Sequence, residues 1–156
     1  MKRAKQLQPL SREHHLGLNL SRHAKDCADT PNEIKAHWQK LTAYIDDMRH
    51  HFQIEDNLIA MALQPYKDSV PKVAAALATL SEQHILLHKQ MEQTQKAEGQ
   101  PITANQVREL GSLLYEHIRF EERELFPLAE AYLSQSELDA IYKASSEKVK
   151  RLDENR

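Results

Sequence analysis

Helix start and stop signals divide this chain into long segments joined by short connections. Capping residues, two of them followed closely by proline, open segments near 11, 31, 70, 104 and 135. Pro65 and Gly99 lie where two of these segments should stop. Four segments of 18 or more residues with short connections are typical of an antiparallel helix bundle.

We therefore predict an all-α protein, an up-down-up-down four-helix bundle over about 11–133 with an additional short C-terminal helix at about 135–152. Composition agrees, because the 156 residues include only three glycines and no segment alternates as a strand does. No linker is long enough to separate two domains, so a single domain is expected over 1–156. Pro127 should kink or end the last bundle helix. The expected bundle helices are 11–28 with Ser11 as its cap, 31–64, 70–98 and 104–127.

The composition also excludes several classes of protein. One cysteine rules out a disulfide scaffold or an intrachain thiolate cluster, and a net charge of -2 provides no basic surface for nucleic acid. No run of 18 apolar residues and no signal peptide is present. We therefore expect a cytoplasmic protein that binds neither nucleic acid nor a membrane. The unusual feature is nine histidines in so short a chain.

Three histidines have a glutamate four positions later: His51 with Glu55, His88 with Glu92 and His117 with Glu121. Glu92 drifts off the apolar face of its helix, so it is expected to be solvated and only the other two pairs are considered further. Residues four apart lie on one face of a helix, about 40° apart around its axis. A third helix carries two histidines at the same spacing, and all three pairs lie on apolar stripes. A carboxylate on such a stripe costs several kcal/mol unless it is paired, protonated or bound to a metal. The placement therefore predicts a metal site, to which the third helix contributes His84 and His88.

These three pairs also lie at one depth of the predicted bundle. His84 lies 13 residues before Ala97, and His117 lies 13 residues after Ala104, which places them level in an antiparallel pair. His51 and His84 are likewise each about 14 residues from the turn between their helices. Six ligating groups should therefore converge at one level of the core.

The first helix should supply the remaining ligand, from either His14 or His15. His14 shares its side of the helix with small residues such as Gly17, whereas His15 shares its side with polar residues such as Arg22. We expect His14 to point inward. His14 is about 14 residues from the next turn and His51 about 20 beyond it, so the second helix must overhang or bend.

Five imidazoles and two carboxylates are too many ligands for one zinc ion and do not match a thiolate site. Mixed nitrogen and carboxylate donors suit iron or manganese, and carboxylates can bridge two ions. Ferritin-like dinuclear sites use Glu-x-x-His pairs and more carboxylates, so that family is disfavoured. The candidate metal ligands are His14, His51, Glu55, His84, His88, His117 and Glu121.

These residues resemble the hemerythrin family, specifically its bacterial HHE cation-binding domains. The similarity covers about residues 10–133. It is carried by His51-Phe52-x-x-Glu55 and, most specifically, by His117-Ile118-x-x-Glu121-Glu122-x-x-Leu125-Phe126-Pro127. Leu10-Ser11-Arg12-Glu13-His14 also resembles the family's approach to its first ligand, which favours His14.

The resemblance implies two iron ions in an oxo- or hydroxo-bridged di-iron centre. Glu55 and Glu121 would bridge the ions, the five histidines would complete the coordination, and one open position would take O₂. Two departures from the family matter. Oxygen carriers have an Asp five residues after the last His, where this chain has Glu121 at four, and many bacterial relatives lack the histidine that His88 supplies.

The leading expectation is a protein that binds or senses a small diatomic ligand, O₂ or NO, at a di-iron centre. One alternative is a protein that reduces NO or peroxide, or that donates iron for iron–sulfur repair. Another is a regulatory metal sensor without gas chemistry. The histidines and acids expected to be surface residues are His15, His23, His37, His50, Asp56 and Glu122.

Overall fold

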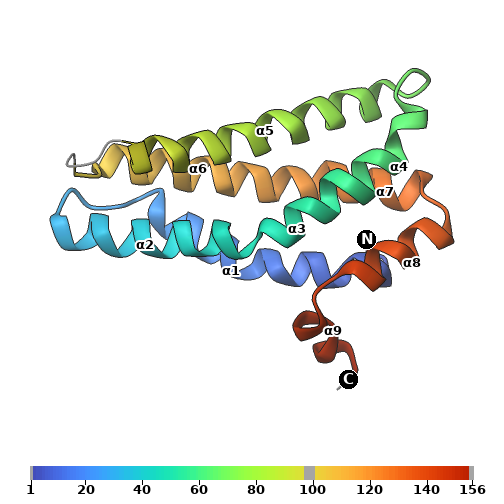
Figure 1. Cartoon of the computed structure of the whole chain (residues 1–156), viewed down its shortest axis with the longest axis horizontal. Helices are drawn as coiled ribbons and strands as arrows, with labels where there is room; N and C mark the ends of the chain where they lie inside the picture. The colour runs from blue at the N-terminus through green and yellow to red at the C-terminus, as the bar shows by residue number, and fades with distance from the viewer. Residues whose placement is uncertain (1, 97–100, 155–156) are drawn as a thin grey trace.

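The computed structural model describes the backbone of residues 2–96 and 101–154, with side chains for 2–92 and 101–150. All regular structure in these ranges is helical (Figure 1). Four long helical segments run alternately up and down, side by side, so the predicted four-helix bundle is confirmed. They begin with α1 (Gln8–Ala24), α2 (Pro31–Asp47), α5 (Pro71–Lys96) and α6 (Ala104–Phe120).

The first helix begins earlier than predicted, and Ser11 is not its cap. A short 3-10 helix, η1 (Lys5–Leu7), leads directly into α1. Pro9 lies in the first turn of α1, where its missing N–H costs nothing, and Leu10 is fully buried beside it. Burial of this apolar segment therefore extends the helix, which ends at Ala24 rather than at 28.

The second predicted helix is a rod with a break at Met48. There ψ changes to 5°, α2 ends, and α3 (Arg49–Ile54) continues at an angle to it (Figure 1). The bend expected from the unequal distances of His14 and His51 to the turn is therefore present. The rod continues through a π-helical turn, η2 (Glu55–Ala60), then α4 (Met61–Leu63) and the 3-10 helix η3 (Gln64–Tyr66).

Pro127 does not end the fourth helix. After α6 comes a second π-helical turn, η4 (Glu121–Leu125), and then α7 (Phe126–Tyr132). The Phe126 N–H donates to the Glu121 carbonyl, five residues back. This wider turn accommodates the proline, whose ring would clash with the preceding carbonyl in a regular helix. The predicted stop of the third helix before Gly99 lies outside the described residues.

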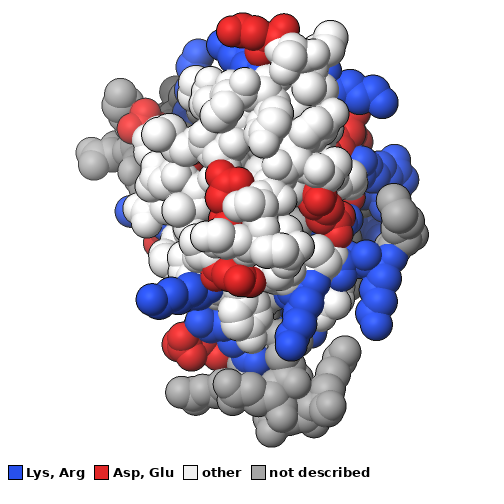
Figure 2. Space-filling view, turned by 90° about the vertical axis from the view of Figure 1, so that its right-hand side faces the viewer, with Lys and Arg blue, Asp and Glu red and all other residues white. Residues whose placement is uncertain are grey.

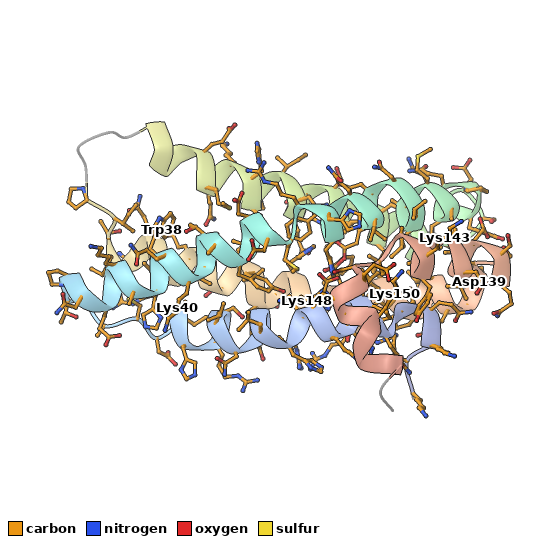
Figure 3. All side chains as sticks on the ribbon, turned by 60° about the horizontal axis from the view of Figure 1, so that its bottom comes forward. Trp38, Lys40, Asp139, Lys143, Lys148 and Lys150 are labelled. Atoms are coloured by element: carbon orange, nitrogen blue, oxygen red, sulfur yellow. The ribbon has the colours of Figure 1, made fainter. Side chains whose placement is uncertain are left out.

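The predicted C-terminal helix is two helices, α8 (Gln135–Ala144) and α9 (Glu147–Glu154). A capping box of Ser134 and Glu137 opens α8, at the position where the sequence predicts the C-terminal helix to begin. In Figure 3, Lys143 lies on α8, and Lys148 and Lys150 lie on α9, which crosses in front of the bundle. The α8 helix packs against η1 and η2, and α9 packs against α1.

The core consists of two apolar clusters with a layer of buried polar side chains between them. One cluster is centred on residues such as Leu10, Leu80 and Phe126, and the other on residues such as Leu41, Leu110 and Ile118. A close approach of α1 to α2 at Gly17 brings the Tyr44 ring against the glycine. The polar layer is formed by His14, His51, Glu55, His117 and Glu121, with His84 at its edge.

The end of the molecule near α4, α7 and α8 carries both kinds of charge. Figure 2 shows Lys and Arg side chains mostly toward the edges of this face and separate Asp and Glu side chains among uncharged residues. Among the described residues, no helix combines the length and the apolar character needed to cross a membrane.

Candidate metal centre

Six of the seven predicted ligands meet in the polar layer. They form two overlapping groups, each of which offers four ligand atoms within 4.8 Å of one another. Both groups contain Glu55 and Glu121, so two glutamates are shared between two pairs of histidines. We call His14 and His51 the first half of the site, and His84 and His117 the second half.

Two kinds of helical segment position these residues. His14 and His84 come from the unbroken helices α1 and α5. His51 and His117 lie in the last turns of α3 and α6, and each is followed four residues later by its glutamate. Glu55 and Glu121 are each the first residue of a π-helical turn. Such turns occur frequently at functional sites.

The imidazoles direct their Nε2 atoms at the two carboxylates, which are fully buried. Glu55 receives His51 Nε2 at 3.0 Å and His84 Nε2 at 3.1 Å. Oε1 of Glu121 lies 3.1 Å from His14 Nε2, which is hydrogen-bonded to it, and 3.1 Å from His117 Nε2, which is close enough for an ion pair but makes no hydrogen bond. Metal–ligand bonds of about 2.0–2.2 Å place neighbouring ligand atoms of one ion about 3 Å apart, so these separations already suit coordination.

Two atoms in the layer have no hydrogen-bond partner. Nε2 of His117 and Oε2 of Glu121 are buried without a hydrogen bond. Buried polar atoms are nearly always satisfied, because an unpaired one costs free energy. A cation between the imidazoles and the carboxylates would satisfy both atoms, and the nitrogen and oxygen donors suit iron or manganese. The residues present therefore fit a metal centre.

Electrostatics in the metal-free chain place positive charge in both halves. Burial alone would lower the pKa of His51, but Glu55 and Glu13 raise it to about 9. Asp56 and Glu55 likewise outweigh burial at His84, whose pKa is raised to about 9. The protonated imidazoles carry positive charge at the place where a metal ion would bind. Metal binding must therefore displace these protons.

The other histidine of each half is held neutral. Burial lowers the pKa of His14 and lowers that of His117 to about 3. Burial would raise the pKa of Glu55, but the charge on His51 and the hydrogen bonds from His51 and His84 hold it well below its usual range. The site therefore combines an ionised carboxylate with neutral imidazoles that are ready to bind a metal.

Each of the four imidazoles is also hydrogen-bonded on its outer nitrogen. Nδ1 lies within hydrogen-bond distance of a side-chain oxygen in every case, which leaves Nε2 free to coordinate. The pairs are His14 with Glu122 at 3.3 Å, His51 with Glu13 at 3.4 Å, His84 with Asp56 at 2.9 Å and His117 with Gln83 at 2.6 Å.

Asp56 is exposed, as expected, and Glu122 is partly buried, but both also contact histidines of the site, which the sequence did not predict. Each directly follows one of the shared glutamates, and each accepts from a histidine of a neighbouring helix rather than of its own. Relative to the histidine five positions before it on its own helix, each acid lies about 140° around the axis, and this spacing does not reveal the contact to another helix. The signal in the sequence was the pair of adjacent acids, Glu55-Asp56 and Glu121-Glu122. Nothing comparable marked Glu13 or Gln83.

His88 does not reach the cluster. Its side chain is 76% exposed, and Nε2 lies 3.3 Å from Glu92. The buried stripe of α5 passes from His84 to Leu87, which is 1% exposed, so His88 lies on the outer side of that turn. The expectation that it is an inward ligand is corrected. The alternative between His14 and His15 is resolved, because His14 is 2% exposed and His15 is on the surface.

Aromatic side chains surround the imidazoles. The Phe52 ring contacts the rings of His84 and His117, with centroids 4.7 and 5.8 Å apart. The Phe126 ring stacks on His14 at 5.5 Å. Both phenylalanines belong to the segments that carry the family resemblance. They hold the histidine rings in place and exclude water from the cluster.

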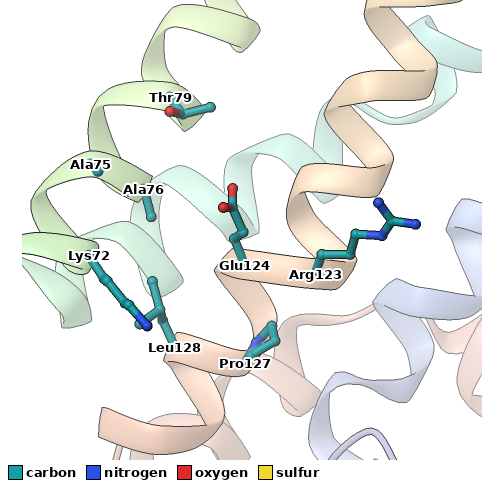
Figure 4. Close-up of a pocket in the computed structure, with 8 residues that line it drawn as sticks. All are labelled: Lys72, Ala75, Ala76, Thr79, Arg123, Glu124, Pro127 and Leu128. Atoms are coloured by element: carbon teal, nitrogen blue, oxygen red, sulfur yellow. The ribbon is translucent and has the colours of Figure 1, made fainter.

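The second half of the site is nearer the surface. The His84 side chain is 12% exposed, against 3% or less for the other three histidines. A small cavity of about 80 Å³ adjoins it and is lined in part by Phe52, Leu87 and Met91. A larger cavity of about 490 Å³ lies between α5 and the segment from η4 to α7 (Figure 4). No cluster residue lines that larger cavity.

Comparison with protein families matches residues 6–129 to the hemerythrin HHE cation binding domain. This range contains all six residues of the cluster and ends within α7. Neither a curated protein nor a solved structure matches the chain significantly.

Proposed function

The chain belongs to the hemerythrin HHE cation-binding family, and we propose that it holds two iron ions in this cluster and binds O₂ there reversibly. In this proposal His14 and His51 hold one ion, His84 and His117 hold the other, and Glu55 and Glu121 bridge them. The observation that carries the proposal is that two four-ligand groups share both glutamates.

The donor set favours iron over zinc. Structural zinc sites are almost always four-coordinate and closed, often with thiolates, whereas the one cysteine of this chain, Cys27, packs in the apolar cluster around Leu110. Imidazole and bridging carboxylate donors suit iron, which would supply the electrons that reversible O₂ binding requires. The chain's own residues hold the ions, orient the imidazoles and keep water away.

The cavity beside His84 suits a small ligand. Its volume of about 80 Å³ is large enough for a diatomic molecule. Its lining combines apolar side chains, which suit uncharged O₂ or NO, with charged and polar ones at Asp46, Arg49 and His88; the apolar residues are Ile45, Phe52, Leu87 and Met91. These features support access of such a ligand from the His84 side.

The burial of the glutamates favours retention of the metal. Glu55 and Glu121 are 0% exposed, and both lie between the two apolar clusters of the core. Release of iron to a partner would require these carboxylates to separate inside the core. This arrangement supports a resident centre over an iron donor.

Anaerobic loading with ferrous iron followed by repeated cycles of O₂ exposure and removal tests the proposal. The wild-type chain should hold two irons, and its visible spectrum should change with O₂ and return when O₂ is removed. His23→Ala, at an exposed position away from the cluster, should behave identically. Irreversible oxidation in the first cycle contradicts reversible binding. Sustained consumption of NO or peroxide would instead support the catalytic alternative.

A further inference from the structure

The four oxygens that hold the outer nitrogens of the histidines are not equivalent. In the first half, both acceptors are carboxylates, Glu122 for His14 and Glu13 for His51. In the second half, Asp56 holds His84, but the neutral amide of Gln83 holds His117. The two halves share the same glutamates, so their main difference lies in these outer acceptors.

A carboxylate and an amide affect a metal-bound imidazole differently. A carboxylate that accepts the Nδ1 proton makes the imidazole a stronger donor and adds negative charge near the ion. Both effects stabilise the ferric state relative to the ferrous state. Hydrogen bonding to ligands is an established way for proteins to set a reduction potential. An amide provides the same geometry without the charge.

Solvent exposure increases the difference between the halves. The Glu13 side chain is 14% exposed and that of Glu122 is 28% exposed, whereas that of Asp56 is 52% exposed. Water and salt therefore screen the charge of Asp56 most strongly. The second half thus has one carboxylate fewer, and the one that it has is the most exposed of the three.

The surroundings of Gln83 do not restore the missing charge. Gln83 lines a cavity of about 360 Å³ between α5 and the α6–η4 segment. Two arginines and two glutamates also line it, so their formal charges cancel; they are Arg119, Arg123, Glu116 and Glu124. The contact from Gln83 to His117 is the shortest of the four, at 2.6 Å.

We propose that Gln83 is a positioning residue that makes the two halves electronically unequal, so that the ion held by His84 and His117 is the more easily reduced. This inference rests on the proposed di-iron function and deepens it. The same half adjoins the small cavity, so in a half-reduced centre an arriving ligand would meet the ferrous ion.

Redox titration of the iron-loaded chain, followed by its visible and EPR spectra, tests the inference through its two one-electron midpoint potentials. Gln83→Glu adds a carboxylate of nearly the same shape at the second half and should lower the higher potential. Glu13→Gln removes a carboxylate from the first half and should raise the lower potential. The two variants should therefore narrow the gap between the potentials from opposite sides.

Ser81→Glu is the matched control, because it adds a negative charge at an exposed position of α5 two residues from Gln83. It should move both potentials little and by similar amounts. Asp56→Asn is an additional test, because it removes a carboxylate from the second half. It should raise the higher midpoint potential and widen the gap between the two potentials. Gln83→Leu removes the acceptor and should weaken iron binding by about 10- to 100-fold.

Two failures can be distinguished. If the wild-type chain binds fewer than two irons, the proposed function fails and this inference fails with it. If two irons bind but Gln83→Glu and Glu13→Gln move the same potential, the inference alone is overturned. It is also overturned if Gln83→Glu shifts the potentials no more than Ser81→Glu does. Should Gln83→Glu fail to fold, an unchanged gap in Glu13→Gln overturns it.

Discussion

Asp56 accepts a hydrogen bond from Nδ1 of His84 at 2.9 Å, across 28 positions of sequence and between two helices. Glu122 makes the equivalent contact to His14, across 108 positions. In both cases the residue directly after a shared glutamate fixes the histidine that a neighbouring helix contributes. The cluster is therefore held from outside by the same segments that supply its bridging carboxylates.

Asp56→Ala should weaken iron binding by about 10- to 100-fold, because the His84 ring loses the acceptor that orients it. Competition with a chelator of known affinity measures the change. Asn57→Ala, the exposed neighbour, is the control and should bind iron as the wild type does. Equal affinity of the Asp56 and Asn57 variants would show that Asp56 does not support the ligand.

His84→Ala and His88→Ala form a matched pair one turn apart on α5. The first should lose iron, because His84 Nε2 points at Glu55, whereas the second should retain two irons, because His88 faces solvent. Metal analysis after loading and desalting gives the counts. A similar loss of iron in both variants would mean that His88 is a ligand, as the sequence alone had indicated.

Gly17→Ala should destabilise the protein. The added Cβ would collide with the Tyr44 ring, at a cost of about 1 to 3 kcal/mol for overpacking, while the gain in helix propensity is at most about 1 kcal/mol. Thermal unfolding measures the difference. Leu16→Ala, at a position that is 58% exposed, should change the free energy of unfolding far less. An unchanged midpoint for Gly17→Ala would show that α1 and α2 separate freely at this point.

Removal of iron should lower the thermal midpoint. A ligand at 100 times its dissociation constant stabilises the folded state by about 2.7 kcal/mol, or about 5 to 11 °C for a chain of this size. Without metal, the core retains buried atoms of His117 and Glu121 that have no partner. Calorimetry before and after chelation gives the shift, and re-addition of iron should reverse it. Identical midpoints would indicate that metal binding is not coupled to folding.

Much of the fold and of the cluster was accessible from the sequence. Capping boxes such as Thr103 with Gln106 locate helices by local chemistry, and the His-x-x-x-Glu spacing places His51 beside Glu55 wherever a helix forms. Such features depend on a few neighbouring residues. These features can therefore be predicted without knowledge of how the helices pack.

Features that depend on contacts between helices were not accessible. His88 faces outward because of how α5 is rotated about its axis relative to the neighbouring helices. His84 and His88 differ by only about 40° around that axis, so the sequence alone does not show which of them faces the core. Gln83 was missed because its partner, His117, lies on another helix. The π-helical turn before Pro127 was missed because the proline signal is the same for a kink, a stop or a wider turn.

Anomalous diffraction at the iron edge from iron-loaded crystals tests the di-iron centre most directly. We predict two peaks in each chain, one beside His14 and His51 and one beside His84 and His117, with Glu55 and Glu121 between them. A single peak, or two peaks that do not share these glutamates, would contradict the proposed centre.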